Sequence, residues 1–126
     1  MEFVALVTLL LVFQYLTFMM LCGMARAKGG VQAPAVSGDE MFERAFRVQM
    51  NTLEQLAVTL PALWICAMYY RPLVAAALGL AFFLGRLLYR TGYMKDPAKR
   101  GPGMMIGFFA NVGLLLAGLW GVVIQM

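Results

Sequence analysis

The 126-residue chain contains no histidine, only two cysteines, and few charged residues, which make up 13% of the sequence. Without histidine, the chain can form neither a Ser-His-Asp triad nor a histidine-activated cysteine nor a His-ligated zinc site. Cys22 and Cys66 lie in separate apolar segments and form no CxxC pair, so we interpret both as small buried hydrophobic residues. These shortages exclude several common catalytic classes, and no metal is expected.

The shortage of charge is accompanied by an excess of apolar residues. Residues of the set AVILMFWYC account for 63% of the chain, more than a small water-soluble protein can bury, because its surface-to-volume ratio is too high. The bilayer is therefore expected to be part of the solvent. The net charge of +4 comes from basic residues beside apolar segments, which favours a role in membrane topology, and no nucleic-acid partner is expected.

Four segments are long and apolar enough to form transmembrane helices, because about 20 apolar residues span a bilayer. We expect these helices at about residues 3–26, 40–70, 73–94 and 102–125. Ser37 or Asp39 is placed to cap the second helix, and Pro61 is expected to kink it. The predicted fold class is an all-α membrane protein, a bundle of four transmembrane helices that forms one domain over residues 1–126.

The basic residues are distributed unevenly between the two ends of these segments. Lys and Arg flank the first and third connections, whereas the other side offers only Arg71. By the positive-inside rule, we expect loops one and three in the cytoplasm and both termini on the opposite side. In the last segment Gly113, Ala117 and Gly121 recur every four residues, which is typical of close helix packing but also of membrane helices in general.

Two stripes of polar side chains lie at the expected cytoplasmic ends of the second and third helices. They comprise Glu43, Arg47, Asn51 and Glu54 on the second helix and Arg86, Tyr89 and Tyr93 on the third, with Arg100 shortly after. Each set shares one helix face. Ionisable groups at membrane depth usually face a partner or a wet cavity, so we expect the stripes to converge on one polar pocket.

The side chains in this expected pocket suit an anionic ligand that also carries an amine. Guanidinium groups bind carboxylates and phosphates, often through two hydrogen bonds, and Glu54 can receive an ammonium group. A ligand with two carboxylates and one amine matches this set, and so does a phosphate-bearing headgroup. A simpler alternative is that long basic side chains reach the lipid headgroups or form ion pairs within the chain. We favour that alternative for Arg44 and Arg90, but not for Arg47, Asn51 and Glu54.

Two sequence motifs resemble those of the MAPEG family, the membrane-associated proteins in eicosanoid and glutathione metabolism. They are FERAFRVQMNTLE at residues 42–54 and GRLLYRTGY at residues 85–93. The segment DPAKR at residues 96–100 is similar to a loop of the type 3 microsomal glutathione transferases. Within the family the chain looks closest to these transferases and to the leukotriene C4 synthase-like members, and the order of the motifs agrees over its whole length.

The resemblance implies a homotrimer of four-helix subunits that bind glutathione, as a co-substrate, between neighbouring subunits near the cytosolic face. The family's glutathione-binding positions are matched here by Arg26, Arg47, Gln49, Asn51, Glu54, Arg86, Tyr89 and Tyr93. Arg100 matches the arginine that activates the thiol. Three positions depart from the family pattern, and they are Ala27 in place of a second arginine, Gln55 in place of a tyrosine and Ala57 in place of a proline.

A glutathione thiol resembles that of free cysteine, with a pKa of about 8.5, so little of it is ionised at neutral pH. Because no histidine base is available, a guanidinium beside the sulfur is the economical way to stabilise the thiolate, and Arg100 is the expected group. The expected function is that of a membrane-bound glutathione transferase that conjugates glutathione to lipophilic electrophiles, reduces lipid hydroperoxides, or does both, as in detoxification. The expected partners are membrane lipids and a lipophilic small-molecule substrate.

Two other functions are compatible with a small membrane bundle. A non-catalytic lipid- or glutathione-binding scaffold is the main alternative, although the presence of Arg47, Asn51, Glu54 and Arg100 argues against it. A transporter or channel component is a second alternative. It is disfavoured because the segments show no inverted repeat and no unwound segment near the middle of the membrane.

Overall fold

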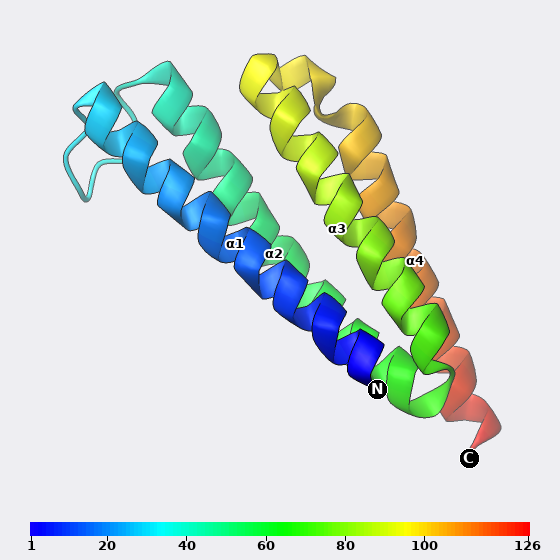
Figure 1. The fold of residues 1–126 in the computed structure, drawn as a ribbon. Coiled ribbons are helices and arrows are strands. Elements are labelled where there is room, and N and C mark those ends of the chain that lie inside the picture. Colours follow the sequence, from blue (N-terminus) through cyan, green and yellow to red (C-terminus); the bar gives the residue numbers. More distant parts are fainter.

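The computed structural model describes residues 1–126 as four long α-helices without any β-strand (Figure 1). The helices are α1 (Glu2–Gly29), α2 (Glu40–Tyr69), α3 (Pro72–Lys95) and α4 (Gly101–Ile124), and a short 3₁₀ helix, η1 (Pro97–Arg100), precedes α4. The predicted all-α, four-helix architecture is confirmed. The first helix ends at Gly29 rather than near residue 26, and the 3₁₀ turn replaces part of an expected irregular connection.

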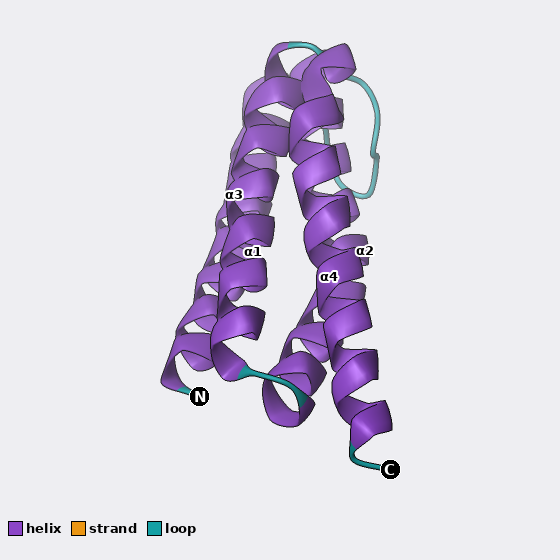
Figure 2. Ribbon diagram, turned by 90° about the vertical axis from the view of Figure 1, so that its right-hand side faces the viewer, coloured by secondary structure: helices purple, strands orange, loops and turns teal.

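The four helices run up and down, so both chain termini lie at the same end of the bundle (Figure 1). The opposite end, called the loop end below, carries residues 30–39 and η1, and Figure 2 shows this first loop beside the helix ends. Helix α2 packs against each of the other three helices, and α3 also packs against α1 and α4. Side chains at the loop-end halves of α2 and α3 are thereby brought face to face.

Local sequence signals explain where the helices begin and end. Helix α1 stops at Gly30, which adopts a left-handed conformation with φ of 69°, as is common after a helix C-terminus. Of the two candidate caps for α2, Asp39 is the one used, because its Oδ2 accepts the N–H of Phe42 at 3.0 Å. Pro72 occupies the first turn of α3, where no N–H is needed. Pro61 lies inside α2, which continues through it.

The outer surface of the bundle is apolar. Only 31 of the 126 residues are buried, and large side chains such as Phe13 and Leu116 are about 60% exposed, which suits lipid rather than water. Three segments are long and apolar enough to cross a membrane, and they are Glu2–Gly29, Pro72–Lys95 and Pro97–Ile124. The protein is therefore an integral membrane protein. Helix α2, expected as a fourth span, is not among these three, because charged residues crowd its first half.

Glycines allow α4 to approach α3 and α2 closely. A Cβ atom on Gly103 would collide with the backbone nitrogen of Tyr89, and one on Gly121 would collide with the backbone of α2. At Gly113, by contrast, a Cβ would meet only the side chain of Leu78, at 3.2 Å. Of the small residues noted in the sequence, Gly121 therefore lies at a close backbone contact with α2, and Gly103 lies at a close backbone contact with α3.

Candidate functional site

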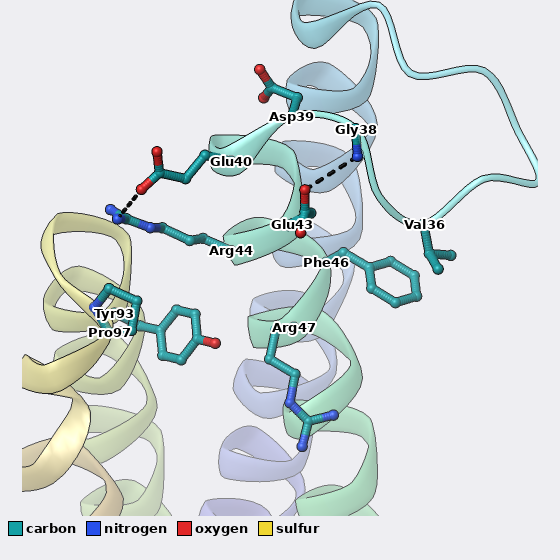
Figure 3. A pocket seen from close by; sticks show the side chains of 10 residues that line it. All are labelled: Val36, Gly38, Asp39, Glu40, Glu43, Arg44, Phe46, Arg47, Tyr93 and Pro97. Atoms are coloured by element: carbon teal, nitrogen blue, oxygen red, sulfur yellow. Dashed lines mark hydrogen bonds and ion pairs between the residues drawn. The ribbon is translucent and has the colours of Figure 1, made fainter.

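A polar cavity of about 630 Å³ lies at the loop end, between the start of α2 and the end of α3 (Figure 3). It is lined by Val36, Gly38, Asp39, Glu40, Glu43, Arg44, Phe46, Arg47, Tyr93 and Pro97. Its volume falls within the range of about 300–1,000 Å³ that is usual for small-molecule sites. Glu43 and Arg47 from one predicted stripe and Tyr93 from the other are brought together here.

The three carboxylates that line the cavity each have a partner within the chain. Asp39 is the N-cap of α2, and Oε2 of Glu43 accepts the backbone N–H of Gly38 at 3.1 Å. Glu40 forms an ion pair with Arg44 one turn later (Figure 3). No group of three or more Asp, Glu, Cys or His side chains is placed to hold a metal ion. The carboxylates therefore order the loop end of α2.

Arg44 joins α2 to the end of α3. Its Nη1 donates to the backbone carbonyl oxygens of Met94 at 2.9 Å and Lys95 at 3.2 Å, which are among the carbonyls that the helix itself leaves without a donor. The guanidinium of Arg44 is thus used by the fold. Among the other groups of the cavity, the phenol of Tyr93 makes no hydrogen bond within the chain, and the guanidinium of Arg47 has only a long contact of 3.7 Å with Glu54.

A buried column of side chains connects this cavity with the interior of the bundle. Arg86 is only 2% exposed, and its Nη2 donates to Oγ1 of Thr52 on α2 at 2.7 Å. Its guanidinium carbon lies 4.1 Å from the ring centroid of Tyr89, which stacks on Tyr93 with centroids 5.6 Å apart. Nε of Arg86 has no hydrogen-bond partner. The third-helix stripe therefore forms one stack that ends at the cavity.

Two further guanidinium groups approach this column. Arg47 lines the cavity together with Tyr93, and Arg100 lies in η1, which packs against α3. Nη1 of Arg47 is 3.7 Å from a carboxylate oxygen of Glu54, and both side chains are more than half exposed. Arg100 is exposed at the end of η1, where its Nη1 donates to the carbonyl oxygen of Pro97 at 2.8 Å. The fold thus brings Arg47 and Arg100 to the loop end, where the stack of Arg86, Tyr89 and Tyr93 also ends.

The remaining predicted site residues do not line the polar cavity. Asn51 is half-buried on α2, Gln49 is half-buried nearby, and neither makes a side-chain hydrogen bond within the chain. Arg26 donates to the carbonyl oxygen of Ala35 at 2.7 Å and lies 4.4 Å from the ring centroid of Phe42. Of the predicted site residues, only Arg47 and Tyr93 line this cavity, so the expected single pocket is formed only in part.

A second cavity, called the lipid-side groove below, has a volume of about 360 Å³ and lies between α2, α3 and α4. It is lined by Gln55, Arg86, Met104, Met105, Gly107 and Phe108. Beside it, Nδ2 of Asn111 donates to Oε1 of Gln55 at 3.1 Å, and Oγ1 of Thr59 lies 2.6 Å from Oδ1 of Asn111. Sequence reasoning missed this polar trio, although one amide in the apolar run of α4 was a usable signal.

Comparison with known proteins agrees with this architecture. The family model described as "MAPEG family" matches residues 4–120. An uncharacterized protein of Synechocystis sp. is 48% identical over 120 residues, which cover 92% of this chain and 88% of that protein. Microsomal glutathione S-transferase 2 of Homo sapiens is 37% identical over 88% of this chain and 73% of its own length. Leukotriene C4 synthase of Rattus norvegicus is 36% identical over 60% of this chain and 51% of that enzyme.

Proposed function

The chain belongs to the MAPEG family, and from this premise we propose that it is a membrane-bound glutathione transferase. In this proposal it conjugates glutathione to lipophilic electrophiles taken from the bilayer. One observation carries the proposal, namely that Arg47 and Tyr93 line the polar cavity while Tyr93 stacks on Tyr89, over which the guanidinium of Arg86 lies. The names of the transferase and synthase relatives support the same reaction class.

Glutathione has two carboxylates, one ammonium group and one thiol, and these groups suit the side chains gathered at the loop end. We assign its binding to Arg26, Arg47, Gln49, Asn51, Glu54, Arg86, Tyr89 and Tyr93. The guanidinium groups take the carboxylates, and Glu54 takes the ammonium. Because one glutathione carries both charges, its binding would replace the long contact of 3.7 Å between Arg47 and Glu54 with two closer ion pairs.

The exposure of Arg47 and Glu54 supports a site that a second copy of the chain completes. Both side chains are more than half exposed on a helix packed among membrane spans, and ionisable groups at that depth are costly unless they face a partner or a wet cavity. Arg26 and Gln49 do not line the cavity of their own subunit, which suits a role toward a neighbouring one. We therefore propose the homotrimer that the family resemblance implies.

Arg100 is proposed to stabilise the glutathione thiolate. Its Nη1 is held by the carbonyl oxygen of Pro97, which fixes the guanidinium while its other N–H groups stay available to a sulfur anion. Each unit by which the thiol pKa falls corresponds to about 1.4 kcal/mol of thiolate stabilisation. The thiol proton passes to solvent, and the thiolate then attacks an electrophilic carbon. A C–S bond forms as the leaving group departs with its electron pair.

The loop end is proposed to face the cytoplasm, with both termini on the other side of the membrane. Glutathione, which is water-soluble, would then reach the site from the cytoplasm. The lipophilic substrate would enter from the bilayer. Reduction of lipid hydroperoxides by the same thiolate stays a second prediction, because the names of the relatives refer to transfer and synthesis.

Turnover by the purified protein in lipid nanodiscs tests the proposal. The parent protein and Arg100→Ala are compared for glutathione-dependent conversion of an aryl halide and of a lipid hydroperoxide, each across a range of pH. We expect Arg100→Ala to lose about tenfold or more of the neutral-pH rate, with a pH–rate profile displaced to higher pH by about one unit and with glutathione affinity largely kept.

Lys99→Ala is the matched control, because Lys99 is also an exposed cation of η1 and its loss changes the net charge by the same amount. Its pH–rate profile is expected to match that of the parent. An unchanged rate in Arg100→Ala would assign thiolate stabilisation to another residue. Glutathione binding by the parent protein without turnover of either substrate would favour the scaffold alternative.

A further inference from the structure

The lipid-side groove contains an amide that the steps proposed above do not use. Gln55 is half-buried and lines this groove together with the exposed side chains of Met104, Met105 and Phe108. Because these apolar side chains are exposed on the outside of a membrane bundle, the groove is open to the bilayer. A lipophilic molecule can therefore enter it without crossing the polar loop end.

The polar trio beside the groove fixes how the Gln55 side chain is presented. The Thr59 hydroxyl has one proton and two acceptors in reach, Oδ1 of Asn111 at 2.6 Å and the backbone carbonyl oxygen of Gln55 at 2.9 Å. The shorter distance assigns the proton to Asn111. Nδ2 of Asn111 then donates to Oε1 of Gln55 at 3.1 Å. The acceptor oxygen of Gln55 is thereby occupied, and its Nε2 makes no hydrogen bond within the chain. The trio thus orients the amide and leaves its donor group free.

Helix association alone does not account for this arrangement. The hydrogen bond between Thr59 and Asn111 already joins α2 to α4, as polar pairs commonly do in membranes. Adding Gln55 to the pair introduces N–H groups into a groove whose other lining residues, Arg86, Met104, Met105, Gly107 and Phe108, carry no side-chain oxygen acceptor. Unpaired N–H groups are unfavourable away from water. An acceptor atom on a bound molecule would remove this cost.

Arg86 gives the same groove a second donor. It lines the groove, forms no salt bridge with any carboxylate, and its Nε has no hydrogen-bond partner. The polar part of the groove therefore offers donors and no negative charge, which suits an oxygen atom that becomes negative during a reaction. Since Arg86 also stands at the base of the Tyr89–Tyr93 column, the groove adjoins the proposed glutathione site.

We propose that Gln55 determines the electrophile specificity of this protein by hydrogen-bonding the carbonyl oxygen of α,β-unsaturated carbonyl substrates held in the lipid-side groove. The proposal rests on the proposed function. The glutathione thiolate forms a bond to the β-carbon, and the C=C electron pair moves to give an enolate, whose oxygen accepts the N–H of Gln55. A proton from solvent then reaches the α-carbon and balances the proton that the thiol released. No group leaves, and no oxidant or reductant is consumed.

Asn111 is the positioning residue in this proposal, since it acts on the substrate only through Gln55. Preorganised donors that face a developing oxyanion contribute about 10²–10³ in kcat when they are well placed. The contribution should be specific to substrates that develop charge on oxygen. An allylic halide of the same chain length also reacts at carbon, but its charge develops on the departing halide instead.

The experiment compares a long-chain alk-3-en-2-one with an allylic bromide of equal length, using the parent protein, Gln55→Met and Asn111→Leu in nanodiscs. We expect the ratio of kcat/KM values, ketone over bromide, to fall by about tenfold or more in Gln55→Met, mainly through kcat. A smaller fall is expected in Asn111→Leu, which keeps the Gln55 donor but releases its orientation.

Thr8→Val is the control, because it removes the acceptor of an interhelical hydrogen bond, from Nε1 of Trp64 at 3.0 Å, that lies outside the groove. Its ratio should equal that of the parent. Ratios that stay equal in the parent, Gln55→Met and Asn111→Leu, while both substrates are converted, would overturn the role of Gln55 and leave the transferase function standing. Conversion of neither substrate by the folded parent would overturn both proposals.

Discussion

Replacing Thr52 with valine tests whether the buried guanidinium of Arg86 depends on its one side-chain acceptor. Valine keeps the shape of threonine and replaces the hydroxyl with a methyl group. The Thr52 hydroxyl donates to the carbonyl oxygen of Val48 at 2.7 Å and accepts the hydrogen bond of Arg86 at 2.7 Å. Since Nε of Arg86 already lacks a partner, the substitution leaves the guanidinium with no hydrogen-bonded side chain.

The expected loss of stability follows from the charge and burial of this hydrogen bond. A hydrogen bond to a charged group contributes about 1.5–3 kcal/mol net, whereas neutral hydrogen bonds between membrane helices average about 0.6 kcal/mol. Arg86 is only 2% exposed, so lipid or water cannot readily replace the missing acceptor. We therefore expect Thr52→Val to lower the free energy of unfolding by about 1.5–3 kcal/mol.

Two other threonines supply matched controls. Thr17 is exposed, and its hydroxyl bonds only to the carbonyl oxygen of Phe13 in its own helix, so Thr17→Val isolates the cost of that local bond. Thr8 also bonds within its helix and in addition accepts from Trp64, so Thr8→Val should cost about 0.6 kcal/mol more than Thr17→Val. Both costs should lie below that of Thr52→Val.

Reversible unfolding in mixed detergent micelles containing dodecyl sulfate is the assay. A double-mutant cycle with Arg86→Met isolates the pair, because the second substitution should cost less once the first has removed the contact. A cost of Thr52→Val no larger than that of Thr8→Val, together with a coupling energy near zero, would refute the reasoning. It would mean that another acceptor, such as a water molecule or a second subunit, satisfies the guanidinium.

Two further outcomes are expected. Gly103→Val should separate α3 from α4 and destabilise the bundle by about 1–3 kcal/mol or more, because a Cβ there would collide with the backbone of Tyr89. Gly23→Val is the control in the same unfolding assay, and it should be nearly neutral because a Cβ at Gly23 meets open space. A cysteine introduced in the exposed first loop as Ser37→Cys should react with a membrane-impermeant maleimide from the cytoplasmic side only. Cys22 and Cys66 are buried and should add little background labelling. Labelling from the opposite side would contradict the proposed orientation.

The four helices could be predicted because long apolar runs are a strong and local signal. The start of α2 was also predictable, since Asp39 is one of the residues that favour a helix N-cap. The 3₁₀ helix at Pro97–Arg100 was not expected, because four residues are too few to show a periodic pattern. The position of Gly103 against Tyr89 also escaped prediction, since it depends on how α4 is rotated against α3.

The candidate site was predictable at the level of helix faces and not at the level of contacts. Spacing alone placed Arg86, Tyr89 and Tyr93 in one stripe, and the structure stacks them in that order. It did not predict that Arg86 would bond to Thr52, 34 positions earlier. Sequence patterns within one helix carry no information about which residue of a distant helix lies opposite. The contact between Gln55 and Asn111, 56 positions apart, was missed for the same reason.

The composition of α2 has a consequence for the biosynthesis of the protein. The other three helices can enter a bilayer by themselves on the basis of length and apolarity, whereas α2 carries charged residues through its first half. Helix α2 also packs against all three of the other long helices. We therefore expect α2 to settle in the membrane only after α3 has supplied a polar surface, and to be held near the insertion machinery until then. The order of insertion would then differ from the order of synthesis.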